Sequence, residues 1–220
     1  MTGPLTRGPR LCRLAAEKGL APALDDLVAG RMQSEDGDIP YGPGGHAIVP
    51  LGVLTDRQRS DCLDIVAVER PDEGKYQVAM LRRSSGERLG EEPPWWRSAV
   101  AWLRLGLSHR LRAQAVERLR ERHSGEQRLV ARQMVQDTLA DALAEQLEAE
   151  ALLLGEPALD DGRPAVQASL GISTADRLLL HLMGASGFEA NGVGAVTWIS
   201  ELIADAYLPD PVEDEGSDGA

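Results

Sequence analysis

The segment Arg122-His123-Ser124-Gly125 holds the residues best suited to contact a phosphate group. It breaks the chain between two long helical patterns, and the second pattern is expected to start near Glu126. A guanidinium can hold a phosphate through two hydrogen bonds, and the first backbone N–H groups of a helix have no partner within that helix. The segment therefore predicts a phosphate contact at Arg122. A solvated arginine at a helix end is the other interpretation.

Three more positions stand at or near helix ends. Gly184 and Gly187 lie near the end of a helical pattern, in the stretch HLMGASGF over 181–188, and glycines at such positions most often just end a helix. Gln133 follows Gly125 by eight residues and could cap a helix or bridge two helices.

Candidate nucleophiles and metal ligands are sparse in the sequence. His109 and His181 have no Ser, Cys or Asp at a telling spacing, so they are expected to be structural or exposed. Cys12 and Cys62 form neither a disulfide framework nor a metal-binding pattern. The acidic stretch 35–38 is too short for a calcium loop and lacks its closing Glu. We therefore predict no catalytic residue and no metal site.

Helical patterns dominate the chain after Trp95. They cover about 95–121, 126–154, 164–183 and 194–207, and the short connections between them predict an antiparallel four-helix bundle over 95–208. Leucines recur every four residues along one face of the first helix. Its other face is expected to be mostly solvated and carries six arginines: Arg104, Arg110, Arg112, Arg118, Arg120 and Arg122.

A different period precedes the bundle. The runs 46–54, 62–70 and 75–83 alternate or are rich in β-branched residues, and Pro71 and Gly74 are typical of a hairpin turn between the last two. A short antiparallel sheet within 46–94 is predicted, with Trp95 and Trp96 as a packing plug between sheet and bundle. Residues 1–45 are expected to be a helical remnant and a loop, and 209–220 a disordered acidic tail. The fold class is mainly α with a small β part.

Composition narrows the function classes. The net charge of −12 over 220 residues argues against nucleic-acid binding, which needs a basic surface. Hydrophobic residues make up 43 % of the chain and aromatics only 4 %, so Leu, Ala and Val must fill the core. The absence of a signal peptide or an apolar run of membrane length favours a cytoplasmic protein that makes no membrane contact.

Two motifs resemble the C-terminal part of the acyl-CoA dehydrogenase family. That family has R-x-Q-F-G, then Gln eight residues after the Gly and L-A-D eight residues further on. Gly125, Gln133 and Asp141 keep this register, whereas His123 and Ser124 depart from it.

The second motif is the family's turn Q-L-H-G-G-x-G-F, whose backbone lies against the flavin. Here Leu182, Gly184, Gly187 and Phe188 match it. The resemblance covers about 46–208 and implies a sheet followed by a four-helix bundle, in a truncated, degenerate member that lacks the family's N-terminal helical domain.

The resemblance also indicates what is missing. The family's pyrophosphate-binding Arg falls on Glu121 in strict register, or on Arg122 if the loop is one residue shorter. Its catalytic Glu, which removes the α-proton of the acyl-CoA, falls on Leu208 in most members and on Trp95 or Trp96 in a minority. None of these residues is a carboxylate.

The resemblance therefore implies a non-catalytic or partner subunit of a flavin-dependent acyl-thioester dehydrogenase complex. The expected partner is a second copy or a full-length dehydrogenase-like subunit, joined through the bundle. FAD contacts would come from Arg122, Gln133, Gly184 and Gly187, although FAD is more often expected to be absent from the isolated chain. An active FAD-dependent enzyme with an unplaced base, and an acyl or CoA-binding module without flavin, are the alternatives.

Overall fold

The computed structural model describes residues 4–32, 39–60, 62–70, 74–83, 93, 95–155, 162–184 and 193–209. The acidic stretch 35–38, Gly187 and most of the acidic tail lie outside these ranges, so the predictions made for them stay predictions. Within the described residues, no helix is both long and apolar enough to cross a bilayer.

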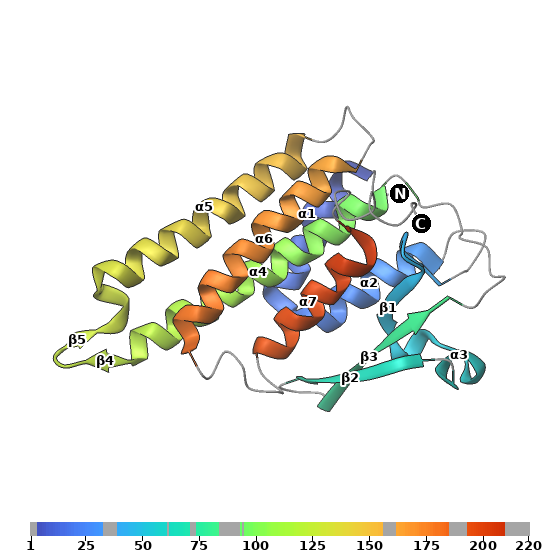
Figure 1. Ribbon diagram of the computed structural model, residues 1–220, viewed down its shortest axis with the longest axis horizontal. Helices are drawn as coiled ribbons and strands as arrows, with labels where there is room; N and C mark the ends of the chain where they lie inside the picture. Colours follow the sequence, from blue (N-terminus) through green and yellow to red (C-terminus); the bar gives the residue numbers. More distant parts are fainter. Residues whose placement is uncertain are drawn as a thin grey trace, which may run out of the picture.

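One long helix, α4 (Trp95–Glu121), lies at the centre of the molecule and contacts α1, α5, α6 and α7 (Figure 1). Its segment 99–108 is buried on every side because neighbouring helices surround it. A helix that is buried all round cannot keep a solvated face. The expectation that the arginine face of this helix is solvated is therefore wrong for Arg104, which is fully buried.

The other helices of the bundle are α5 (Gln133–Gly155), α6 (Arg163–Met183) and α7 (Val193–Tyr207). The ranges of α6 and α7 agree with the sequence patterns, whereas α5 begins seven residues later than expected. Pro164 occupies the first turn of α6, where its missing N–H costs nothing, and Gly184 ends that helix with φ +61°. Only glycine adopts this conformation without strain.

Two N-terminal helices complete the helical layer. They are α1 (Pro4–Lys18) and α2 (Leu20–Met32), and α1 packs along α4. The close approach needs glycine: a Cβ at Gly106 would collide with the backbone carbonyl of Cys12, and one at Gly8 with the ring of Trp102. Residues 4–9, which the sequence gives no helical period, are helical because this packing stabilises them.

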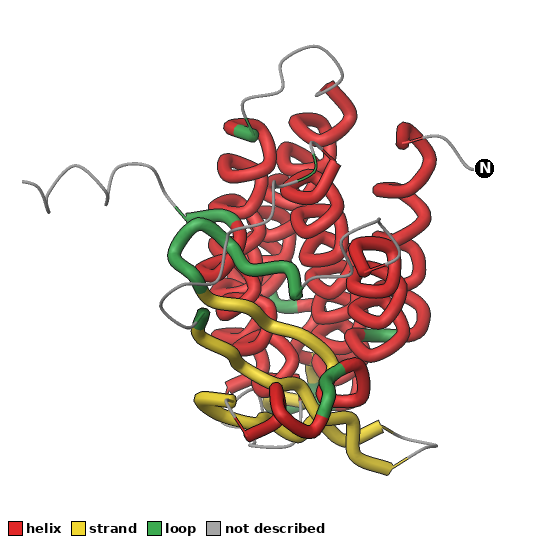
Figure 2. Tube along the Cα trace, turned by 90° about the vertical axis from the view of Figure 1, so that its right-hand side faces the viewer, coloured by secondary structure: helices red, strands yellow, loops and turns green. Residues whose placement is uncertain are grey.

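The predicted sheet is present at one end of the helical layer (Figure 2). It contains β1 (His46–Pro50), β2 (Cys62–Arg70) and β3 (Gly74–Arg82) in the antiparallel order β1-β3-β2. The first strand is shorter than expected because Leu51–Val53 form a 3-10 turn, η1. A short helix, α3 (Asp56–Ser60), joins it to β2.

Tyr207 at the end of α7 fixes the sheet to the bundle. Its hydroxyl accepts a hydrogen bond from the backbone N–H of Ile48 at 2.9 Å and donates one to the carbonyl of the same residue at 3.1 Å. The ring of Trp96 meets Tyr207 edge-on at 5.2 Å, and Trp95 meets Trp96 edge-on at 5.7 Å. Trp96 thus packs on the residue that joins bundle and sheet, and it belongs to the same hydrophobic core as Ile48 and Val49 of β1.

The connection between α4 and α5 differs from the prediction. A two-stranded hairpin occupies it, made of β4 (His123–Ser124) and β5 (Gln127–Arg128), and a 3-10 turn, η2 (Leu129–Ala131), follows. The hairpin projects from the end of the bundle opposite the three-stranded sheet (Figure 1). Gly125 supplies φ +66° at the first turn position, which suits a two-residue hairpin loop.

Candidate functional site

Arg122 leaves the end of α4 at the base of this hairpin, with its side chain exposed. Its backbone carbonyl accepts a hydrogen bond from the N–H of Leu129 at 2.9 Å, which closes the hairpin. The guanidinium of Arg132 donates to the carbonyl of Ser124 at 3.1 Å and to its Oγ at 2.9 Å. Arg132 therefore holds the hairpin, and Arg122 extends into solvent.

The helix start expected near Glu126 is wrong, because α5 begins at Gln133. Residues 123–131 instead pair with one another in the hairpin and in η2. The first N–H groups of α5 therefore come eleven residues after Arg122 in the chain and do not follow it directly.

The other described residues predicted to contact FAD are Gln133 and Gly184, which lie at the ends of two different helices. Gln133 is the exposed first residue of α5. Gly184 ends α6, and the space around its Cα is open, since a Cβ there would meet no atom within 4 Å. Its position agrees with the simpler interpretation of a helix-ending glycine. Gly187 lies outside the described residues.

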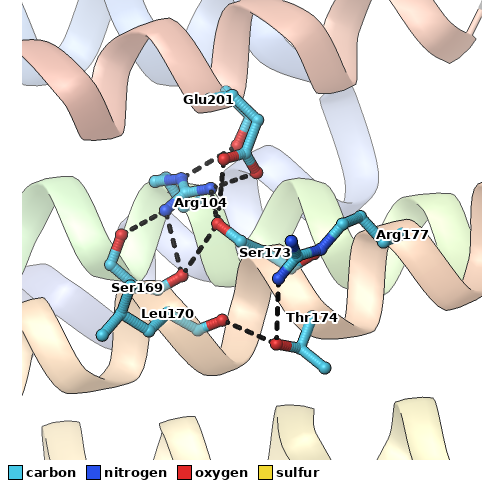
Figure 3. A network of polar contacts seen from close by, with 8 residues as sticks. Arg104, Ser169, Leu170, Ser173, Thr174, Arg177 and Glu201 are labelled. Carbon is cyan, nitrogen blue, oxygen red and sulfur yellow. Dashed lines mark hydrogen bonds and ion pairs between the residues drawn. The ribbon is translucent and has the colours of Figure 1, made fainter.

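The largest buried polar site was missed in the sequence. Arg104 lies inside the bundle, where α6 and α7 surround its guanidinium (Figure 3). Nε donates to Oγ of Ser200 at 3.1 Å, and Nη1 donates to the carbonyl and hydroxyl of Ser169. Nη2 donates to Oγ of Ser173 at 3.0 Å and to a carboxylate oxygen of Glu201 at 2.7 Å. Every nitrogen of the guanidinium is thus hydrogen-bonded.

Carboxylates of α6 and α7 balance the charge of Arg104. Burial lowers the pKa of Arg104, while the carboxylates of Glu201, Asp176 and Asp205 raise it. The ordinary pKa of arginine lies so far above neutral pH that Arg104 stays charged. The Glu201 side chain is 40 % exposed, so water still reaches the anionic partner of this ion pair.

A second polar group lies close to the first, around Ser108 of α4. Nε2 of Gln146 donates to Oγ of Ser108 at 2.7 Å, and the carboxyl of Asp176 is hydrogen-bonded to the same serine. Both Oε1 of Gln146 and Oδ1 of Asp176 are buried without a partner among the described residues. Burial raises the pKa of Asp176 to about 7, and its bond to Ser108 and the charge of Arg104 only partly oppose this.

The sequence contains a pattern that predicts the burial of Arg104. Arg104 stands in the apolar stretch 99–107 of a helix, which predicts burial, and a buried arginine needs several oxygen acceptors. Ser169 and Ser173 are four residues apart and therefore share one face of α6. The pattern predicts a buried arginine but does not say which helix supplies its acceptors. Such a site stabilises and orients the bundle.

One candidate nucleophile, Cys12, is buried between helices. Sγ of Cys12 lies 4.0 Å from Nδ1 of His109 in the contact between α1 and α4. Burial raises the pKa of Cys12 to about 12 and lowers the pKa of His109. A neutral thiol beside a neutral imidazole is unreactive at neutral pH. Among the described residues, no group of three or more His, Cys, Asp or Glu side chains is arranged to hold a metal ion.

The positions at which the resemblance would place a catalytic carboxylate are apolar core. Leu208 is 5 % exposed, Trp96 is 3 % exposed and Trp95 packs on the edge of Trp96. Asp205, three residues before Leu208, is exposed on α7. Leu208 follows the end of α7 and is buried, whereas Asp205 is exposed, so Asp205 does not take the place of that side chain.

No family model and no curated protein matches the sequence. Among solved structures, the ChsE4-ChsE5 complex from Mycobacterium tuberculosis matches with a TM-score of 0.51 and 14 % identity, over 92 % of this chain and 76 % of that one.

Two further structures match with lower TM-scores. XiaF from Streptomyces sp., in complex with FADH2 and glycerol, has a TM-score of 0.48 and 17 % identity, over 94 % of this chain and 73 % of that one. The acyl-CoA dehydrogenase from Slackia heliotrinireducens has a TM-score of 0.47 and 12 % identity, over 90 % and 70 %. Identities this low show the fold alone. The chain shares the fold of acyl-CoA dehydrogenase-type structures, a small antiparallel sheet followed by a helical bundle.

Proposed function

We propose that this chain is a non-catalytic partner subunit of a flavin-dependent acyl-thioester dehydrogenase complex. The observation that carries the proposal is the apolar packing at the expected base positions, where Leu208 and Trp96 are core residues. Removal of a proton next to a thioester carbonyl needs a base within hydrogen-bond reach. A chain whose fold is kept and whose base is replaced by core side chains fits a structural role beside an active subunit.

The partnership has independent support. One structure that shares the fold, with a TM-score of 0.51, is itself a complex, ChsE4-ChsE5. The outer surface of this bundle carries large exposed apolar side chains, including Leu143 and Leu147 of α5. Exposed apolar groups of this size on a single chain commonly mark an interface. The partner expected here is a full-length dehydrogenase-like subunit that supplies the base and most flavin contacts.

The first prediction concerns the isolated chain. Purified alone, it is expected to show no flavin absorbance and no reduction of an electron acceptor by acyl-CoA substrates, because Leu208 and the two tryptophans supply no base. An absorbance spectrum and a turnover assay measure this directly. About one bound flavin per chain, bleached by an acyl-CoA, would instead establish a working flavoenzyme. Tight CoA binding without flavin would indicate a binding module.

The second prediction concerns Arg122. If the chain or its complex binds a phosphate-bearing group, the exposed guanidinium of Arg122 is expected to contact it. A charge-assisted hydrogen bond contributes roughly 1.5–3 kcal/mol, so Arg122→Ala is expected to weaken binding by about tenfold to a hundredfold. Titration of the co-expressed complex with FAD or CoA would give the dissociation constants.

Arg118→Ala is the matched control, because Arg118 is exposed one helical turn earlier on α4. It is expected to change the dissociation constant much less than Arg122→Ala. Equal losses in both variants would indicate diffuse electrostatic attraction in place of a site. No loss in either would remove the phosphate role of Arg122, and with it the flavin contact expected at Gly184.

A further inference from the structure

The outer face of α5 consists of three parallel rows of exposed side chains. Each row has the same spacing of four and then seven residues, which aligns its members along one line of a helix. The rows are Leu143, Leu147 and Leu154; Ala140, Ala144 and Ala151; and Asp137, Asp141 and Glu148. Successive rows are offset by three residues, so they lie side by side on the helix surface.

The leucine row places three exposed large apolar side chains along one line of the bundle surface. Leu147 is 55 % exposed, Leu154 is 59 % exposed and Leu143 is 38 % exposed. Its two ends are eleven positions apart, or about 16 Å of helix. With the small side chains of the alanine row beside it, a partner helix could approach α5 closely and cover both rows.

The charge of α5 restricts what that partner can be. The helix carries five acids and no Lys, Arg or His. Its acid row borders the alanine row, and Glu150 borders the leucine row on the other side. A second α5 brought against this face in either direction would place carboxylates next to carboxylates, and like charges at close range oppose association.

We propose that the leucine and alanine rows of α5 bind a helix of an unlike protein chain, one whose own apolar row is flanked by Lys or Arg. Leucines of the partner would cover Leu143, Leu147 and Leu154, and its basic side chains would pair with Asp137, Asp141 and Glu148 at the rim. The proposal rests on the partner-subunit function and specifies its contact surface. It excludes pairing of α5 with a second copy of itself.

Synthetic helical peptides can serve as the probe. One peptide carries a leucine row flanked by lysines, and the other carries the same row flanked by glutamates. The lysine peptide is expected to bind the wild-type chain at least about tenfold more tightly, with a preference that fades at high salt. Fluorescence anisotropy of labelled peptides measures both dissociation constants. Equal binding of the two peptides, or absence of binding by the lysine peptide, would overturn the proposal.

Variants locate the site. Leu147→Gln is expected to weaken binding of the lysine peptide about tenfold or more, because it removes apolar contact at the centre of the row. Leu170→Gln is the control, since Leu170 is comparably exposed, at 43 %, but lies on α6. Replacing the acid row by lysines (Asp137→Lys, Asp141→Lys and Glu148→Lys together) is expected to reverse the peptide preference. Equal effects at Leu147 and Leu170, or an unchanged preference, would contradict the assignment.

Sedimentation of the chain alone tests whether a second copy of the chain binds the leucine and alanine rows of α5. If the wild type associates at all, Leu147→Gln is expected to leave that association unchanged. A dimer that Leu147→Gln converts to a monomer would make a second copy the occupant of α5 and overturn the proposal. Flavin absorbance and acyl-CoA turnover of the isolated chain report on the proposed function and do not depend on α5. The proposed partner-subunit function and the proposed contact surface on α5 can therefore be contradicted separately.

Discussion

Arg104→Ala is expected to lower the free energy of unfolding by about 4 kcal/mol, a large share of the roughly 5–15 kcal/mol typical of a domain. The substitution removes the hydrogen bonds that tie α4 to α6 and α7 at Ser169, Ser173 and Ser200. It also leaves a cavity in the centre of the bundle. Urea unfolding followed by the helical circular dichroism signal measures the loss.

Two further substitutions separate charge from geometry at this site. Arg104→Lys keeps the positive charge but offers a single nitrogen where the guanidinium offers three, so about half of the loss is expected. Glu201→Gln is expected to cost only about 1 kcal/mol, because the Glu201 side chain is 40 % exposed and water already screens the ion pair.

Arg118→Ala is the surface control and is expected to stay within about 0.5 kcal/mol of the wild type. If Arg104→Ala is as stable as Arg118→Ala, the hydrogen bonds at Arg104 only offset the cost of burying its charge. The bundle would then be held by apolar packing alone.

The fold could be predicted because its signals are local. The alternating runs near 46, 62 and 75 give the three strands, and Pro164 and Gly184 mark the two ends of α6. The extension of α1 back to Pro4 could not be predicted, because that end of the helix is stabilised by packing on α4. The close contact of Gly8 with Trp102 joins residues 94 positions apart, which no local pattern encodes.

The errors at the candidate site have physical causes. The helical period of α5 does not tell where the helix starts, and the turn formed by Gly125 with the Arg132–Ser124 contacts delays it to Gln133. The charge of the arginines in α4 favours one common solvated face, but their surroundings in the structure differ. Arg104 is enclosed by helices and Arg118 is exposed. Arg110 donates to the carbonyls of Ala16 and Glu17 at the end of α1.

The buried carboxyl of Asp176 is expected to make the stability of the chain pH-dependent near neutrality. Burial raises its pKa to about 7 in the folded chain, against an ordinary value of 3.8. Between these two values the folded chain holds a proton that the unfolded chain has lost. The contribution of Asp176 to stability is therefore complete below about pH 4, falls as the pH rises to about 7, and then stays constant.

The size of this effect follows from the displacement of the pKa. Each pKa unit corresponds to about 1.36 kcal/mol, so the free energy of unfolding is expected to fall by at most about 4 kcal/mol between pH 4 and pH 8. Its physical source is the Oδ1 atom, which is buried without a hydrogen-bond donor among the described residues. An ionised carboxylate in that position has neither water nor a donor for one of its oxygens.

Asp176→Asn tests this assignment because it replaces the carboxyl with a neutral group of the same shape. The variant is expected to match the wild type near pH 4 and to be more stable at pH 8, with the difference growing as the pH rises from about 4 to about 7. Urea unfolding at half-unit steps from pH 4 to pH 8.5 would show it (about nine steps). Asp141→Asn, an exposed site on α5, is the control and is expected to follow the wild type throughout.

Parallel stability curves for the wild type and Asp176→Asn would mean that Asp176 keeps an ordinary pKa in the folded chain. The carboxylate would then be stabilised by Arg104, whose charge already opposes the rise in the pKa of Asp176. Arg104→Lys in the Asp176→Asn background separates these cases. If Asp176 is ionised and held by Arg104, the two substitutions interact strongly. If Asp176 is protonated, their effects on the free energy of unfolding add at pH 5, because a neutral carboxyl has little charge interaction to lose.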